Sequence, residues 1–469
     1  MLNLSTCAWL PDQISHRHDG LTKASGVIPI GNGYVPIGQL QPVTTALADF
    51  AGGAAYIAAD GTSSLLAGGA TALHRWSGTA WVSQFATPGA GKWQFGQFGD
   101  FAIGVYGGAP VKYNLATGVA ALLGGSPPNA KYITIGGNFV VVAGSVAANS
   151  TVSWSGFNAA ETWTSGSNQS DDQQLPDGGK ITGLAGHENY FLTFQRDAIN
   201  RFTYVGAPAV FQRDKISTGV GCISPGTIQQ AGEMTFFLSE RGFMLTDGNS
   251  VTPIGNEQVD RSFFNSFSRA ELHNVSAAVD PRQHLYFVTC PGSPGRMWIY
   301  NWALQRWSNA TLNIKAVFPA FTSNIGLDAL DALYPGGIDS IPVSLDSPLF
   351  QGGEPRLYAV DVAGFVGAFS GENMEAVVEW PFQDVGIRAR PFMARPITDA
   401  IADVTLTIDA RARLGDGTAN VVSSDLRASG HIPVRCNGRY LLPSLAFAAG
   451  ARWTNVQGLE IEFGTGGRR

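Results

Sequence analysis

The sequence predicts an all-β protein, a degenerate β-propeller of about six to eight blades that carries a C-terminal β-sandwich-like platform domain. The first observation is a hairpin pattern: in residues 133–143 an apolar run meets a Gly-Asn turn, and a β-branched run leads away from it. The second is the repetition of this pattern at 234–239, 285–289 and 297–302. The third is the spacing, because units of roughly 30 to 50 residues with about four strand candidates each are typical of propeller blades.

Seven candidate units follow one another along the chain. They cover residues 51–83, 93–123, 131–170, 181–220, 226–254, 273–312 and 313–371. The units have neither a WD dipeptide nor a kelch signature, so the pattern does not fix the blade count. The last unit contains a stretch rich in Asp, Pro and Gly at 325–355, which we interpret as a long excursion from the propeller.

We expect three regions. Residues 1–45 form an extended arm that supplies platform strands, residues 46–375 form the propeller, and residues 376–469 form the platform. The last region has a different sequence pattern, because three of its segments alternate apolar and polar side chains with a period of two: 377–380, 404–411 and 458–463. Such strands build a sandwich-like sheet with one face toward solvent or a partner.

One amphipathic helix is predicted in this β-rich chain, within residues 257–272. Its apolar face is formed by Val259, Phe263, Phe264 and Phe267, at positions i, i+4, i+5 and i+8. Asn256 is a suitable N-cap, because its side-chain oxygen can accept a hydrogen bond from an unpaired N–H group of the first turn.

Composition fits a turn-rich β-protein with a weakly charged surface. Gly and Pro account for 58 and 25 of the 469 residues, without the three-residue period of collagen, and charged residues make up only 14%. From residue 376 onward there are 11 Arg, no Lys and 9 acidic residues, which leaves 19 basic and 27 acidic residues before it. An arginine-only platform suits forked polar contacts with other chains, but it is too weakly basic to predict a nucleic-acid footprint of its own. A soluble β-protein without such contacts fits the composition equally well.

The sequence predicts no catalytic, cofactor-binding or metal site. It contains no GxSxG, HExxH or Walker motif, and its histidines give no metal-ligand spacing apart from His16 and His18, which an exposed tail explains better. The four cysteines form no CxxC pair and are expected to be free thiols; they are Cys7, Cys222, Cys290 and Cys436.

Two groups of residues have both a functional and a structural interpretation. Asp171, Asp172 and Asp177, with Asn168, could supply oxygen ligands for calcium, but they match no EF-hand spacing, and a solvated polar loop is the better interpretation. Several tryptophans could stack on sugars, but their regular placement in the repeats favours structural packing. These tryptophans are Trp76, Trp81, Trp154, Trp163, Trp298, Trp302 and Trp307.

The N-terminal residues do not form a signal peptide. Asp12, His16 and Asp19 lie where a signal peptide needs an apolar core, and no run approaches the roughly 18 apolar residues of a membrane-spanning helix. We therefore expect a protein that is made and folded in a cytoplasm.

Five features in order give the sequence a resemblance to a known family. They are the turn from 154–156 to 162–163, the segments 184–194, 199–202 and 219–222, the pair of strands at 236–243 before the predicted helix, the segments 284–287 and 299–301 with Trp307, and a β-rich C-terminal domain. Over residues 130–469 the chain thereby resembles the packaged-DNA stabilisation proteins, the tail hub or nozzle proteins of short-tailed bacteriophages.

The resemblance implies a structural virion protein with no enzymatic activity and no cofactor. It implies a homo-oligomeric, six-fold ring below the portal and its adaptor protein, which extends the DNA channel, retains the packaged genome and anchors fibres, spikes or a needle. The protein would be assembled in the host cytoplasm and located in the virion tail. Packaged double-stranded DNA would pass through the channel without sequence-specific binding.

On this hypothesis the alternating platform strands build the ring interface. The candidate interface residues are Leu406, Ile408, Arg411, Arg413 and Ile461. The rival hypothesis is a receptor- or glycan-binding propeller, part of a tail fibre or a degenerate sialidase-like protein. Residues 153–156 and 162–164 resemble a sialidase box but lack its Asp and its spacing. A cytoplasmic propeller scaffold with unrelated partners is a third hypothesis.

Overall fold

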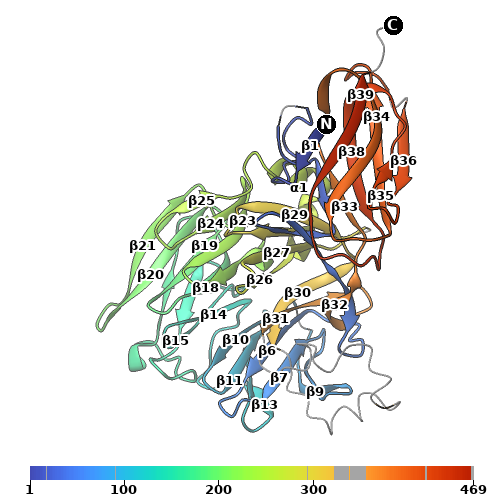
Figure 1. The fold of residues 1–469 in the computed structure, drawn as a ribbon. Coiled ribbons are helices and arrows are strands. Elements are labelled where there is room, and N and C mark those ends of the chain that lie inside the picture. The colour runs from blue at the N-terminus through green and yellow to red at the C-terminus, as the bar shows by residue number, and fades with distance from the viewer. Residues whose placement is uncertain are drawn as a thin grey trace.

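The computed structural model describes residues 1–321, 337 and 355–465, with the exceptions of residues 17, 90, 293, 418 and 419. Figure 1 shows a propeller, coloured blue to yellow, and a platform of long orange and red strands that stands at one side of it. The first and last strands lie at the platform, where β1 (Leu2–Ser5) pairs with β39 (Val456–Thr465). The predicted excursion at 325–355 lies outside the described residues, apart from 337 and 355.

The propeller consists of four-stranded antiparallel units that repeat one strand order. The first three units are β6 (Gly52–Ile57), β7 (Ser63–Gly68), β8 (Ala72–Trp76) and β9 (Trp81–Ala86); β10 (Gln94–Phe98), β11 (Phe101–Val105), β12 (Val111–Asn114) and β13 (Val119–Leu122); and β14 (Tyr132–Gly136), β15 (Phe139–Ala143), β16 (Thr151–Trp154) and β17 (Asp171–Gln174). The next three are β18 (Ile181–Gly186), β19 (Tyr190–Gln195), β20 (Ala198–Gly206) and β21 (Val210–Thr218); β22 (Gln229–Ala231), β23 (Met234–Ser239), β24 (Gly242–Thr246) and β25 (Val251–Pro253); and β26 (Ser276–Asp280), β27 (Leu285–Cys290), β28 (Arg296–Asn301) and β29 (Arg306–Thr311). The seventh is β30 (Ile314–Phe321), β31 (Pro355–Asp361), β32 (Val366–Asn373) and β5 (Gly38–Pro42).

The first strands of these units close into a ring. Strands β6, β10, β14, β18, β22, β26 and β30 contact one another in that order, and β30 contacts β6. In the described chain six units are separate sheets, whereas β26–β29 form one end of a larger mixed sheet. Strand β5 lies within the residues expected to form the arm, but it pairs with β32 (Gly367 opposite Pro42) and so completes the seventh blade. The predicted all-β propeller is confirmed, and each predicted unit overlaps one observed blade.

Apolar and aromatic side chains fill the spaces between neighbouring blades. Between the third and fourth blades, the Phe139 ring lies 5.0 Å from that of Phe211, and the Trp154 ring lies 5.1 Å from the same ring. Such pairs contribute about 0.5–1.5 kcal/mol each beyond the burial of their area. The repeated aromatic residues of the sequence therefore join one blade to the next.

The platform is continuous with the sixth blade in one fifteen-stranded mixed sheet. Its further strands are β2 (Lys23–Ser25), β3 (Val27–Ile30), β4 (Gly33–Pro36), β33 (Ala376–Glu379), β34 (Gln383–Thr398), β35 (Val404–Arg411), β36 (Val421–Asp425), β37 (Ile432–Pro433) and β38 (Gly438–Phe447). Strand β2 is the joint, because Ser25 pairs in parallel with Asn309 of β29 while Ala24 pairs antiparallel with Val378 of β33. Long strands β34, β38 and β39 then form the body of the platform (Figure 1).

The platform strands bury every second residue, as their sequence predicts. In β35 the side chains of Val404, Leu406 and Ile408 are buried, whereas Thr405 and Thr407 between them are partly exposed. Because successive side chains of a strand point to opposite faces, this alternation gives each strand one core face and one outer face. The outer faces are the surfaces available to a partner.

The predicted helix is shorter than expected and has a different N-terminal cap. It divides into α1 (Asp260–Ser266) and the 3-10 turn η3 (Arg269–Asn274); two further 3-10 turns are η1 (Ser167–Gln169) and η2 (Pro225–Thr227). Asn256 does not cap it. The Asp12 carboxylate of the N-terminal arm instead accepts hydrogen bonds from the backbone N–H groups of Arg261 and Ser262, both at 2.7 Å. A carboxylate at this position satisfies free N–H groups and complements the positive end of the helix, so a distant residue takes the place of a local cap. In the described residues, no helix is long and apolar enough to span a membrane.

Candidate interaction surfaces

Three of the predicted interface residues lie in the platform core. Leu406, Ile408 and Ile461 are between 0% and 1% exposed and belong to one apolar cluster with Leu445 and Phe447. Their prediction as interface residues is wrong. The alternation was interpreted correctly, but these three side chains occupy the inward face of their strands, where no partner can reach them.

The two predicted arginines differ from each other. Arg411 is directed at its own platform: its guanidinium lies 2.7 Å from the Asp409 carboxylate, and its carbon Cζ lies 4.7 Å from the centre of the Phe382 ring. Arg413 lies in an exposed turn, where its backbone N–H donates to Asp416. Of the five predicted residues, Arg413 therefore has the most accessible charge.

Sequence analysis did not identify the outward face of β34. The arginine face, as we call it, consists of Arg388, Arg390, Phe392, Arg395 and Ile397, all of which are exposed. Phe392 is 54% exposed and Ile397 is 41% exposed, which is unusual for large apolar side chains on a long strand. The signal was an Arg-x-Arg-x-Phe pattern, but a bulge between Pro391 and Met393 interrupts the period of two. Aromatic residues and arginine are enriched in protein–protein interfaces, so this face has the composition of one.

A groove lies at one end of the arginine face. Its volume is about 480 Å³, and its lining includes Arg390, Phe392, Asn420, Arg435 and Asn437. The Arg388 Nε atom donates to Asn437 Oδ1 at 2.9 Å and orients that amide. In the described part of the chain neither Arg390 nor Arg435 has a carboxylate within ion-pair distance, so two guanidinium groups are available to an anionic ligand.

The propeller has an acidic face. Because every blade repeats one antiparallel order, the turns after its first and third strands lie on the same side of the ring. These turns and their borders carry Asp60, Asp100, Glu161, Glu188, Glu233, Asp247 and Asp280. Some of these carboxylates stabilise their own turns: Asp60 accepts a hydrogen bond from the Thr62 N–H at 2.9 Å. Glu188 and Glu233 are exposed at turn tips, where their carboxylates face solvent.

Three of these carboxylates, Glu188, Glu233 and Asp247, lie in turns of the adjacent fourth and fifth blades. His187, at the end of β18, lies 3.1 Å from the Thr235 hydroxyl on β23 and stacks on the Tyr190 ring at 4.3 Å. Burial lowers the pKa of His187, although Glu233 acts against this. Burial raises the pKa of Tyr190, and the carboxylates of Glu233 and Asp247 raise it further. Glu233 and Asp247 therefore lie near the His187–Tyr190 pair, and Glu188 follows His187 in its turn; we call these three carboxylates the acidic turns.

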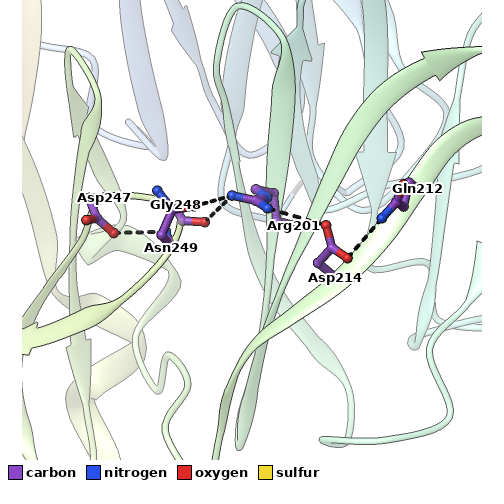
Figure 2. Close-up of polar contacts among 6 residues, drawn as sticks. All are labelled: Arg201, Gln212, Asp214, Asp247, Gly248 and Asn249. Carbon is purple, nitrogen blue, oxygen red and sulfur yellow. Dashed lines mark hydrogen bonds and ion pairs between the residues drawn. The ribbon is translucent and has the colours of Figure 1, made fainter.

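Arg201 holds these two blades together below the patch. Figure 2 shows its guanidinium between Asp214 of its own blade and the 247–250 turn of the fifth blade. It donates to the Gly248 carbonyl at 3.1 Å and to the Asn249 side chain, and its Nη2 atom lies 3.3 Å from Asp214. Because Arg201 is engaged by these partners, it does not neutralise Glu188 or Glu233.

Two carboxylates of the predicted polar loop have protein partners. Asp171 accepts a hydrogen bond from the Ser165 hydroxyl at 2.7 Å, and Asp177 pairs with Lys215 at 2.8 Å. In the described residues no group of three or more His, Cys, Asp or Glu side chains is placed to hold a metal ion. The four cysteines are free thiols.

The structural interpretation of the tryptophans is confirmed where they are buried. Trp154, Trp298 and Trp307 are between 0% and 4% exposed, and the Trp307 indole N–H donates to the Ile254 carbonyl at 2.9 Å. These three rings are part of the packing between strands and cannot stack on a sugar.

Comparisons with known proteins find structural neighbours only. No protein family and no curated protein matches the sequence. Among solved structures, the RRP9 WD40 repeats match with a TM-score of 0.41 and 8% identity, over 61% of this chain and 88% of that one. The extracellular domain of the putative hybrid two component system BT4673 from B. thetaiotaomicron matches with a TM-score of 0.44 and 10% identity, over 77% of this chain and 43% of that one. A streptogramin B lyase structure matches with a TM-score of 0.39 and 10% identity, over 70% and 96% of the two chains.

Proposed function

We propose that this chain is a structural virion protein, the hub or nozzle of a short-tailed bacteriophage tail. The observation that carries the proposal is the arginine face of β34, an exposed strand surface on which arginines alternate with Phe392 and Ile397. The sequence resemblance described above gives the same class of function. Its partners would be further copies of the chain, the portal adaptor and the fibre, spike or needle proteins.

The architecture suits a load-bearing ring. A closed propeller is a rigid body with short, protected edges, and here it is joined to the platform through hydrogen-bonded strands rather than through a flexible linker. A contact between two different surfaces of identical subunits generates a ring when the rotation closes. In this proposal the ring encloses the DNA channel, and the packaged double-stranded DNA passes without sequence-specific contacts.

The rival function, glycan or receptor binding by the propeller, has less support from the described residues. Three of the tryptophans that could stack on sugars are buried in the packing between strands. A glycan array separates the two proposals, because a receptor-binding propeller retains defined glycans whereas a hub retains none.

Quantitative mass spectrometry of purified particles from the source tests the proposal, with the portal protein as an internal count. A six-fold hub below a twelve-fold portal is expected at about half the copy number of the portal. A copy number that is a multiple of three but not of six would favour a fibre-associated protein. Absence of the chain from the particles would refute the virion function.

A further inference from the structure

The platform groove carries positive charge that no carboxylate of the described chain neutralises. Arg390 and Arg435 both line it, and neither has a carboxylate partner in the described chain. Phe392 adds an exposed apolar surface beside them, and the Asn437 amide, oriented by Arg388, adds a polar group. Guanidinium groups bind carboxylates through paired hydrogen bonds, so the ligand that this groove fits is a carboxylate-bearing peptide segment.

The acidic turns carry an excess of negative charge. Glu188 and Glu233 are exposed at the tips of neighbouring turns, and Asp247 lies beside them. The packing of His187 against Thr235 fixes the two blades relative to each other, so the carboxylates are held on a rigid base. Arg201, which joins these two blades, is bound by Asp214 and the turn at 248–249.

The groove and the acidic turns cannot meet within one molecule. Figure 1 shows the end of β34 and β39 at the far side of the platform, whereas β18–β25 lie at the opposite side of the propeller. Each surface is therefore available to another chain.

We propose that the platform groove of one copy binds the acidic turns of a second copy. This inference rests on the proposed ring-forming function and names the two surfaces that would build the ring. The guanidinium groups of Arg390 and Arg435 bind the carboxylates of Glu188 and Glu233, and Phe392 packs against the turns between them. Because the two surfaces are different, the contact is heterologous, and it leaves one free groove and one free acidic patch at the ends of every open oligomer.

The contact is expected to depend strongly on salt. Raising the ionic strength from about 0.01 M to about 1 M shortens the screening length from about 30 Å to about 3 Å. The oligomer of the purified chain should therefore dissociate on addition of salt, whereas a contact made by apolar surface alone should strengthen.

A charge-swap experiment tests the pairing. Sedimentation velocity at low salt measures the oligomers of the wild type, of R390E/R435E, of E188R/E233R and of the four-fold variant. Each double variant is expected to weaken self-association by about tenfold or more, because like charges then face each other, and the four-fold variant is expected to regain most of it. Mixing the two double variants should restore assembly, because the arginine groove of E188R/E233R binds the acidic turns of R390E/R435E and the two altered surfaces pair as they do in the four-fold variant.

Two single variants control for charge reversal outside the proposed contact. R452E reverses an exposed arginine of the platform outside the groove, and D100R reverses an exposed carboxylate on the second blade. Both should self-associate like the wild type. Circular dichroism and thermal unfolding of every variant show whether it is folded.

The outcomes are decisive in both directions. Loss in both double variants with recovery in the four-fold variant supports the pairing. A wild type that remains monomeric at low salt, double variants that associate normally, or a four-fold variant without recovery would overturn it. If the charge swap fails but the chain is present in particles at a six-fold copy number, this contact is rejected and the hub function stands. If the charge swap succeeds but the chain is absent from particles, the contact stands and the hub function is rejected.

Discussion

Replacement of Asp260 by Asn is expected to remove a pH-dependent loss of stability from this protein. Asp260 begins α1, and its side chain lies against Gly242 and Gly255, where a Cβ atom would come within 2.0 Å of the carboxylate. One oxygen accepts a hydrogen bond from the Phe243 N–H at 3.0 Å, and the other is buried without a partner. The charged form is therefore desolvated and only half satisfied.

This environment raises the pKa of Asp260. Burial raises the pKa from an ordinary value of 3.8 to about 6, the Phe243 N–H opposes the rise, and the nearby carboxylate of Asp12 adds to it. The folded protein therefore binds this proton more tightly than the unfolded chain does. Stability from this group is fully present below pH 4 and is lost as the pH rises through 6. A difference of about two pKa units corresponds to about 3 kcal/mol of unfolding free energy.

The assay is urea unfolding between pH 4 and pH 8, followed by tryptophan fluorescence. Trp307 is a local reporter, because its ring lies 4.9 Å from that of Phe243. The wild type should lose stability over this range relative to Asp260→Asn. The Asn amide can shift the whole curve by leaving a new donor unpaired, so the difference in slope is the measurement rather than the value at one pH.

The control is Glu257→Gln, which removes an exposed carboxylate that pairs with Arg261 close to the same helix. An exposed pair of this kind contributes little, so this variant should follow the pH profile of the wild type. Parallel profiles for wild type and Asp260→Asn would refute the reasoning, because they would mean that Asp260 does not titrate in this range.

Three further predictions concern the platform, the helix cap and the junction between blades. Leu406→Asp should unfold the platform, because an isolated charge cannot be buried in its core. Limited proteolysis should then release propeller fragments, whereas the control Thr407→Asp, on the outer face of the same strand, should stay resistant to the protease. Asp12→Ala should destabilise α1 by about 1 kcal/mol and speed hydrogen exchange at the Ser262 amide, and unchanged exchange would contradict the capping role. Arg201→Met should cost about 1–2 kcal/mol and speed exchange in the 247–250 turn; protection equal to that of the wild type would mean that the bonds drawn in Figure 2 do not hold the blades.

Local patterns in the sequence determined the β-units of this protein. The hairpin order of β14 and β15 and the alternation of β35 follow from side chains a few residues apart, which set the strand period and the turns. The packing role of Trp298 and Trp307 followed from their place in the repeats, and the structure confirms it.

Only the tertiary structure decided which face of each strand is accessible and which distant residues meet. Alternation gives two faces but not their direction, so Leu406 and Ile408 were expected outside and lie inside. Asp12 caps a helix 249 residues away, and β5 completes a blade whose other strands lie more than 270 residues later. Likewise Glu188 and Glu233 lie in turns of neighbouring blades only because these two blades pack side by side. Such contacts depend on how the chain closes into a ring, and no local period in the sequence encodes that closure.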